Sequence, residues 1–350
     1  MFRRVLVAAV VLLALLAGAT SRASSTTISP CKRVSQPTWS PDGQQIAYYG
    51  TRWPAPHRMS LNILQALCTM NADGTNAQPV RYTVCSEHCP DPPYPNVWLQ
   101  SGILFMRGGD IFRIVPGSKP QGLARADTIG FVTNPTGTRI ASQKYYDSCV
   151  TCAAPVTTFD AQSGAVVGRA GGNKFDNVDP SLSPDGTKVA FARYSSHGPS
   201  TAYGVWTAST NGSHLRQLEK VGRQPLWSST GGEIAYVVPA KSGWPVTLRV
   251  VSAGGGKSRA LLRDVATVFG WSPDGKSIAF ETSKDKLAVV DVATRKVHSL
   301  LQLHFAPTAV WSPDSSELLV NTVPKTQKCW STWRVPANGS APTKISSCTG

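Results

Sequence analysis

Histidine is the residue type in this sequence that most readily suggests chemistry, because a neutral imidazole can ligate a metal ion or transfer a proton. Four of the six histidines, His57, His88, His197 and His304, fall in segments expected to open on one side of the molecule. Convergent loops of this kind could ligate a divalent metal, and His57, His197 and His304 are the candidate ligands. Because their spacing is irregular, we expect dispersed surface side chains and no metal site.

Other catalytic patterns are absent from the sequence. It contains no Gly-x-Ser-x-Gly elbow, P-loop, His-Glu-x-x-His pair or EF-hand spacing. Asp176 and Asp179 could contribute to a calcium site, although a solvated loop before a strand explains them better. We therefore expect no catalytic residue and no cofactor.

The sequence is organised by a repeated turn. Ser-Pro-Asp-Gly is a type I turn in its preferred residues: Ser accepts a backbone hydrogen bond, Pro presets φ, and Gly relaxes the last position. We expect the Asp to hold its own turn. An apolar strand follows each turn, and a tryptophan often precedes it. The copies are Ser40–Gly43, Ser183–Gly186, Ser272–Gly275 and a near-copy at Ser312–Ser315, with looser forms at Asn134–Gly137 and Ser228–Gly231.

A second strand pair completes each repeat. Seven such pairs are joined by Asn-Gly-like hairpin turns, against six clear first halves. The missing first half is a degenerate one at Val97–Phe105, where the turn is shortened. Four strands per repeat of about 40–50 residues is the period of a β-propeller blade. The sequence predicts an all-β protein, a single β-propeller of four-stranded blades, with seven blades favoured and six the fallback.

Trp271–Phe280 and Trp39–Tyr48 carry the phrase Trp-Ser-Pro-Asp-Gly-x-x-Ile-Ala-Phe/Tyr, which resembles the TolB-type, WD-like β-propeller repeat. The resemblance covers essentially the whole chain after its N-terminal segment. It implies the fold and leaves the function open, because such propellers serve as docking modules, lyases and peptidase gating domains. Some secreted propellers of similar repeat type are polysaccharide lyases that hold a divalent metal through clustered histidines.

The N-terminus has the features of a secretory signal. Arg3 and Arg4 precede an apolar run over Val5–Leu16, and Ser21 and Ala23 suit a signal peptidase. We expect residues 1–23 to be a cleaved signal peptide, and residues 24–350 to form the TolB-like propeller. The protein would be exported, extracellular or periplasmic, with no transmembrane segment in the mature chain.

The charge is strongly basic, at +15 for the whole chain. Cleavage would remove Arg3, Arg4 and Arg22 and leave 32 basic against 20 acidic residues, a net charge of +12. In an exported protein such an excess favours anionic envelope polymers or lipid head groups over nucleic acid, unless it is only a solvated surface. We expect a monomeric, non-enzymatic binding or scaffolding module of the cell envelope or extracellular space, which docks a protein or an anionic polymer at one face. The alternative is a secreted, metal-dependent lyase acting on an acidic polysaccharide.

The tryptophans fall into two groups. Those before the turns, Trp39, Trp227, Trp271 and Trp311, are expected to pack between blades. Trp53, Trp244 and Trp330 lie in connecting segments and are the better candidates for stacking on a ligand.

The eight cysteines are expected to form disulfides, because the count is even and the chain is exported. Strand order places all eight on the face opposite the Ser-Pro-Asp-Gly turns. Cys329 and Cys348 are equidistant from the turn at Asn338-Gly339, which favours a bridge across that hairpin. The expected pairs are Cys31–Cys68, Cys85–Cys89, Cys149–Cys152 and Cys329–Cys348, with Cys31–Cys348 as an alternative that would join the first and last blades.

Overall fold

The computed structural model describes residues 30–52, 63–85, 94–144, 154–194, 204–303, 308–322 and 330–346. In these residues the regular structure is almost entirely β, with one short 3₁₀ turn, η1 (Pro30–Lys32). The predicted signal peptide, residues 1–23, lies outside the described residues, so its cleavage stays a prediction.

The strands follow one another with short connections, as the repeated turns predict. Their bounds are β1 (Arg33–Trp39), β2 (Gln45–Arg52), β3 (Ile63–Asn71), β4 (Gln78–Cys85), β5 (Tyr94–Leu99), β6 (Gly102–Arg107), β7 (Asp110–Ile114), β8 (Gln121–Ala124), β9 (Thr128–Thr133), β10 (Arg139–Lys144), β11 (Val156–Asp160), β12 (Val166–Ala170), β13 (Asp176–Leu182), β14 (Lys188–Tyr194), β15 (Gly204–Ser209), β16 (Arg216–Glu219), β17 (Arg223–Trp227), β18 (Glu233–Pro239), β19 (Val246–Ser252), β20 (Arg259–Trp271), β21 (Ser277–Thr282), β22 (Lys286–Asp291), β23 (Val297–Gln302), β24 (Thr308–Trp311), β25 (Glu317–Thr322), β26 (Ser331–Pro336) and β27 (Thr343–Ser346).

Consecutive strands pair antiparallel into five four-stranded sheets and one seven-stranded sheet, β17 to β23. The long strand β20 belongs to two units. Its first half, Arg259–Val265, pairs with β19, and its second half, Val265–Trp271, pairs with β21. Divided at Val265, the described strands make seven four-stranded antiparallel units, which we call blades 1 to 7 in chain order.

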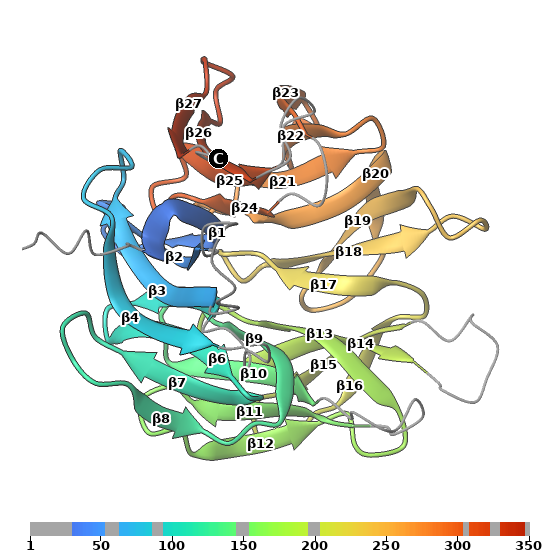
Figure 1. Ribbon diagram of the computed structural model, residues 1–350. Coiled ribbons are helices and arrows are strands. Elements are labelled where there is room, and N and C mark those ends of the chain that lie inside the picture. Colours follow the sequence, from blue (N-terminus) through green and yellow to red (C-terminus); the bar gives the residue numbers. More distant parts are fainter. Residues whose placement is uncertain are drawn as a thin grey trace, which may run out of the picture.

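The blades form a closed ring. Their first strands β1, β5, β9, β13, β17, β20 and β24 contact one another in this order, and β24 returns to β1. Figure 1 shows the first strand, β1, lying beside β24 and β25 from the end of the chain. The Asn321 side-chain amide closes this junction by donating to the Val34 carbonyl at 2.6 Å.

The core lies between adjacent blades. In one cluster, Ile46 and Tyr48 of blade 1 pack with Leu319 of blade 7, and all three are fully buried. In the next, Ala47 and Leu67 of blade 1 pack with apolar residues of blade 2. Each sheet therefore buries both faces against its neighbours, as repeat architectures require.

Antiparallel order divides the connections between two faces. The turns that join the first to the second strand and the third to the fourth strand of each blade lie on one face, called here the turn face. The connections between the second and third strands, and those between blades, lie on the other, called here the loop face.

Candidate functional site at the turn-face mouth

Each Ser-Pro-Asp-Gly turn is held by its own side chains. In the first copy, the Ser40 hydroxyl donates to Asp42 Oδ1 at 2.6 Å, and the Gln44 N–H donates to the same oxygen at 3.0 Å. The Gly43 N–H closes the turn on the Ser40 carbonyl at 2.9 Å. The hydrogen bonds from Ser40 and Gln44 hold the pKa of Asp42 below its ordinary value. The prediction that this aspartate serves its own turn is confirmed.

The tryptophans before the turns join neighbouring blades. The indole N–H groups of Trp39, Trp271 and Trp311 donate to the preceding blade, at the carbonyls of Val310 (3.3 Å), Leu226 (3.0 Å) and Gly270 (3.2 Å) respectively. Trp227 is buried as well, but its indole donates to Gly231 of its own turn. The expected packing between blades is confirmed.

The turns also contact one another around the ring. A Cβ at Gly43 would lie 3.6 Å from Pro313 of blade 7, and one at Gly186 would lie 2.8 Å from Arg139 of blade 3. Because the turns are neighbours, four of their five second-position prolines border a common opening. The opening is a cavity of about 910 Å³, called here the mouth, which falls within the size range of ligand sites.

The mouth has a rigid and mainly apolar lining. Four prolines, Pro41, Pro135, Pro273 and Pro313, line it from four different blades. The tryptophans Trp39, Trp98 and Trp311 contribute beside them, with Val97, Leu99 and Val310. Proline and tryptophan lose little conformational freedom on binding, so such a lining is preorganised for a ligand.

Two arginines supply the charge in the mouth. Arg139 Nη1 lies 2.8 Å from Asp160 Oδ2. Arg113 Nη2 donates to the carbonyls of Ala161 and Gln162, the latter at 3.0 Å. The Ser163 N–H and hydroxyl, together with Arg139, hold the pKa of Asp160 below its ordinary value. Both guanidinium groups therefore contact one turn of blade 3. Asp160 compensates the charge of Arg139, whereas the backbone carbonyls that Arg113 contacts are neutral, so the mouth keeps one net positive charge.

A second, smaller hollow adjoins the mouth. It has a volume of about 460 Å³, lies between blades 3 and 4, and shares Thr138 and Arg139 with the mouth. Its other lining residues are small and polar, namely Asp185, Gly186, Thr187, Ser209, Thr210 and Asn211. An extended ligand seated in the mouth could continue along this polar hollow.

The sequence did not identify the mouth residues as a site. Each proline explains its own turn, so nothing in a single repeat indicates that the pyrrolidine rings gather. The feature that could have indicated them is the recurrence of the same turn at the same end of each blade. A ring of such blades brings these turns together on one face. Arg113 has no signature in the sequence.

Most of the residues predicted to carry chemistry fall in segments that the structure does not describe. His57, His88, His197, His304 and Trp53 lie outside the described residues. Among the described residues, no three His, Cys, Asp or Glu side chains are grouped as metal ligands would be. None of the described helical segments has the length and apolar character of a membrane span.

Asp179, a calcium candidate, instead joins blades near the axis. Its N–H donates to Gln143 Oε1 of blade 3 at 2.7 Å. Burial raises the pKa of Asp179, although the Gln224 N–H of blade 5 and nearby Arg223 act in the opposite direction. Its role in the described structure is a contact between blades.

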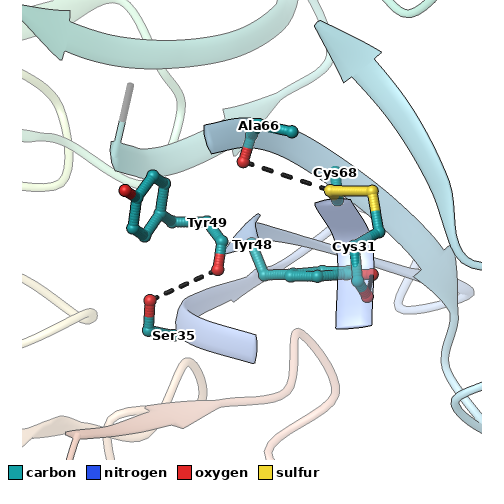
Figure 2. Close-up of a disulfide and its surroundings, with 6 residues drawn as sticks. All are labelled: Cys31, Ser35, Tyr48, Tyr49, Ala66 and Cys68. Atoms are coloured by element: carbon teal, nitrogen blue, oxygen red, sulfur yellow. Dashed lines mark hydrogen bonds between the residues drawn. A yellow bond between two sulfur atoms is a disulfide. The ribbon is translucent and has the colours of Figure 1, made fainter. Parts of the chain in front are cut away.

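The structure contains the expected Cys31–Cys68 disulfide, with the two Cα atoms 5.8 Å apart. Figure 2 shows it beside Tyr48, whose hydroxyl donates to the Cys31 carbonyl at 2.9 Å. Cys31 therefore does not pair with Cys348. The expectation that every cysteine lies at the loop face is wrong for Cys68. It is the sixth of nine residues in β3 and fully buried, because that strand begins earlier than its apolar pattern indicated.

The remaining expected pairs are not described. Cys89, Cys149, Cys152, Cys329 and Cys348 lie outside the described residues, and only the backbone of Cys85 is described, at the end of β4. The pairs Cys85–Cys89, Cys149–Cys152 and Cys329–Cys348 stay predictions.

Sheets of four antiparallel strands around a common axis define the class of the protein as a β-propeller. No protein-family model and no curated protein matches the sequence. Solved structures do match. An oligogalacturonate lyase in complex with manganese has a TM-score of 0.66 and 14% identity over 87% of this chain and 89% of that one. The oligogalacturonate lyase of Vibrio parahaemolyticus has a TM-score of 0.64 and 12% identity over the same shares.

TolB from Acinetobacter baumannii is also similar, with a TM-score of 0.51 and 12% identity over 93% of this chain and 87% of that chain. The fold is therefore that of a TolB-type propeller, as the repeated phrase implied. At these identities the likeness shows the fold and does not carry a function to this chain.

Proposed function

We propose that this chain is an exported, non-enzymatic binding module that docks a segment of a partner protein in the turn-face mouth. The observation that carries the proposal is the mouth itself: a cavity of about 910 Å³ at the centre of one face, lined by prolines and tryptophans from several blades. Rigid aromatic and apolar walls are typical of pockets that receive an anchoring side chain. The Cys31–Cys68 disulfide supports an oxidising compartment outside the cytosol.

The mouth carries only one net positive charge, that of Arg113, which is less than a repeating anionic polymer would need and is compatible with a protein segment. Arg139 is paired with Asp160, and Arg113 bonds backbone carbonyls. A polyanion entering here would have to displace these partners. A peptide can instead place apolar side chains against the prolines and polar main chain along the adjoining hollow.

A matched pair of glutamines provides the test. Gln100 lines the mouth, whereas Gln121 is exposed on the outer strand of the same blade. With the purified protein as bait in envelope extracts, Gln100→Arg should abolish retention of the specific partner. Gln121→Arg adds the same charge and should retain that partner like the wild type. Equal retention by both variants would refute docking at the mouth.

Ionic strength separates the two kinds of partner. Binding of a polyanion should weaken steeply between low and physiological salt, where charges are screened over about 8–10 Å. Binding of a protein segment in the apolar mouth should change little over the same range of salt concentration. A steep salt dependence that Gln100→Arg does not alter would favour an anionic polymer on the basic surface.

The alternative function is a metal-dependent lyase for an acidic polysaccharide. The basic charge of the chain suits such a substrate, and His57, His197 and His304 are the candidate ligands. Metal analysis of the purified protein tests it, followed by an assay for unsaturated products from polygalacturonate. Stoichiometric divalent metal that is lost on substituting these histidines, with product formation, would replace the binding module by the enzyme.

A further inference from the structure

The most exposed aromatic side chains of the described residues all lie in loop-face connections, spread over several blades. Three of them are more than a third exposed: Trp244 (51%), Trp330 (38%) and Phe175 (36%). Trp244 lies between the second and third strands of blade 5, and Trp330 directly precedes the third strand of blade 7. Phe175 lies in the connection from blade 3 to blade 4. The exposed apolar residues of the turn-face turns, such as Val115 and Leu215, are aliphatic.

Trp244 is held at the end of a well-defined hairpin. The connection Ala240–Pro245 joins β18 to β19, and in Figure 1 this hairpin extends outward beyond the sheets at the right. The Gly243 N–H donates to the Ala240 carbonyl at 2.8 Å, and the Ser242 hydroxyl donates to the Trp244 carbonyl at 2.8 Å. These bonds order the connection while the indole stays half exposed, three residues after exposed Lys241.

The described connections of the two faces differ in charge. Five basic and two acidic residues occupy the described loop-face connections: Arg125, Lys174, Lys220, Lys241 and Lys284 against Asp127 and Asp285. The described turn-face turns are balanced, because the repeated turn places aspartate there. They hold Lys119, Lys257, Lys276, Arg295 and Lys296 against Asp42, Asp73, Asp185, Asp274 and Asp314. The positive charge excess of these connections therefore lies on the face that carries the exposed aromatic residues.

We propose that the loop face docks on an anionic lipid bilayer, with Trp244 inserted at the level of the lipid head groups. Tryptophan prefers this interface because one part of its ring is apolar and its N–H is polar. Lysine can keep its charge among the head groups while its stem contacts apolar surface. Each basic residue near an anionic leaflet adds to the attraction.

The arrangement suits a flat surface better than a single polymer chain. Trp244 belongs to blade 5 and Trp330 to blade 7, so blade 6 lies between the two connections that carry them. Phe175 already faces the Arg193 guanidinium, whose carbon lies 4.7 Å from the ring centroid. A protein docked in this way would hold the turn-face mouth away from the bilayer, open to a partner.

Vesicle flotation with the purified protein tests the proposal. Vesicles of phosphatidylcholine with added phosphatidylglycerol should retain the wild type, and vesicles of phosphatidylcholine alone should retain much less. In the wild type, insertion would remove the exposed half of the Trp244 indole from water. Trp244→Ser loses this burial, so it should reduce the partition coefficient by at least about tenfold. Lys241→Gln should reduce it by about fivefold.

Val115→Ser is the control, because Val115 is also 51% exposed but lies on the turn face. It should bind vesicles like the wild type. Tryptophan fluorescence should shift to the blue on anionic vesicles and be quenched by brominated lipids, and Trp244→Ser should lose most of this response. No binding to anionic vesicles at low salt would overturn the proposal. So would equal binding by Trp244→Ser and Val115→Ser, or binding to polygalacturonate but not to vesicles.

Discussion

Gly74, in the turn between β3 and β4, offers a direct test of how the ring closes. Its φ is +88°, and a Cβ at this position would lie 2.3 Å from the Ile345 carbonyl oxygen in β27 of blade 7. The turn of the first blade therefore rests on the backbone of the last. Gly74→Ala should open or distort this contact.

The expected cost has two parts. An alanine in the left-handed region costs about 1–2 kcal/mol. Moving the turn away from a backbone oxygen costs a further 1–3 kcal/mol, about the range for overpacked sites. Gly117→Ala isolates the first part, because Gly117 has a φ of +85° and no atom within 4 Å of the added Cβ. Gly74→Ala should therefore lose about 1–3 kcal/mol more than Gly117→Ala.

Urea denaturation followed by tryptophan fluorescence and circular dichroism measures the difference. A second pair repeats the comparison elsewhere in the ring. A Cβ at Gly212 would lie 2.3 Å from the Arg169 carbonyl oxygen, whereas one at Gly339 would meet nothing within 4 Å. If Gly74→Ala and Gly212→Ala are no worse than their controls, the turns do not support the neighbouring blade and the reasoning fails.

Three further predictions concern export, oxidation and acid. Secreted protein should begin at Ser24 on N-terminal sequencing, and material beginning at Met1 would contradict the cleaved signal. Cys31→Ser should lose about 4 kcal/mol of unfolding free energy, since the disulfide closes a separation of 37 residues, and an unchanged urea midpoint would contradict this. Hydrogen bonds within the turns lower the pKa of Asp42, Asp185 and Asp314. These carboxylates therefore stabilise the folded state above about pH 4, and this stabilisation is lost as the pH falls through the lowered pKa values. The urea midpoint of the wild type should decrease in that acid range, and the midpoint of Asp185→Asn should decrease less. The same pH dependence in the wild type and in Asp185→Asn would contradict this.

The fold could be predicted from the sequence because its information is local and repeated. The Ser-Pro-Asp-Gly turns specify their own geometry through hydrogen bonds between neighbours in the chain, such as Ser40 to Asp42. The apolar runs after them specify strands, and the repeat period specifies four strands to a blade. The Cys31–Cys68 pair could also be predicted, because both cysteines fall in the first repeat.

The mouth depends on contacts that no local pattern encodes. Pro41 and Pro313 are 272 positions apart in the sequence, and they border one cavity only because blade 7 returns to blade 1. Arg113 and Asp160 belong to different blades and reach the mouth through side-chain placement alone. Cys68 appeared to begin its strand because the apolar run Leu67–Met70 is only the later part of β3. Local hydrogen bonding and periodicity determined the blades, whereas ring closure determined the site, because only closure brings distant repeats within contact distance.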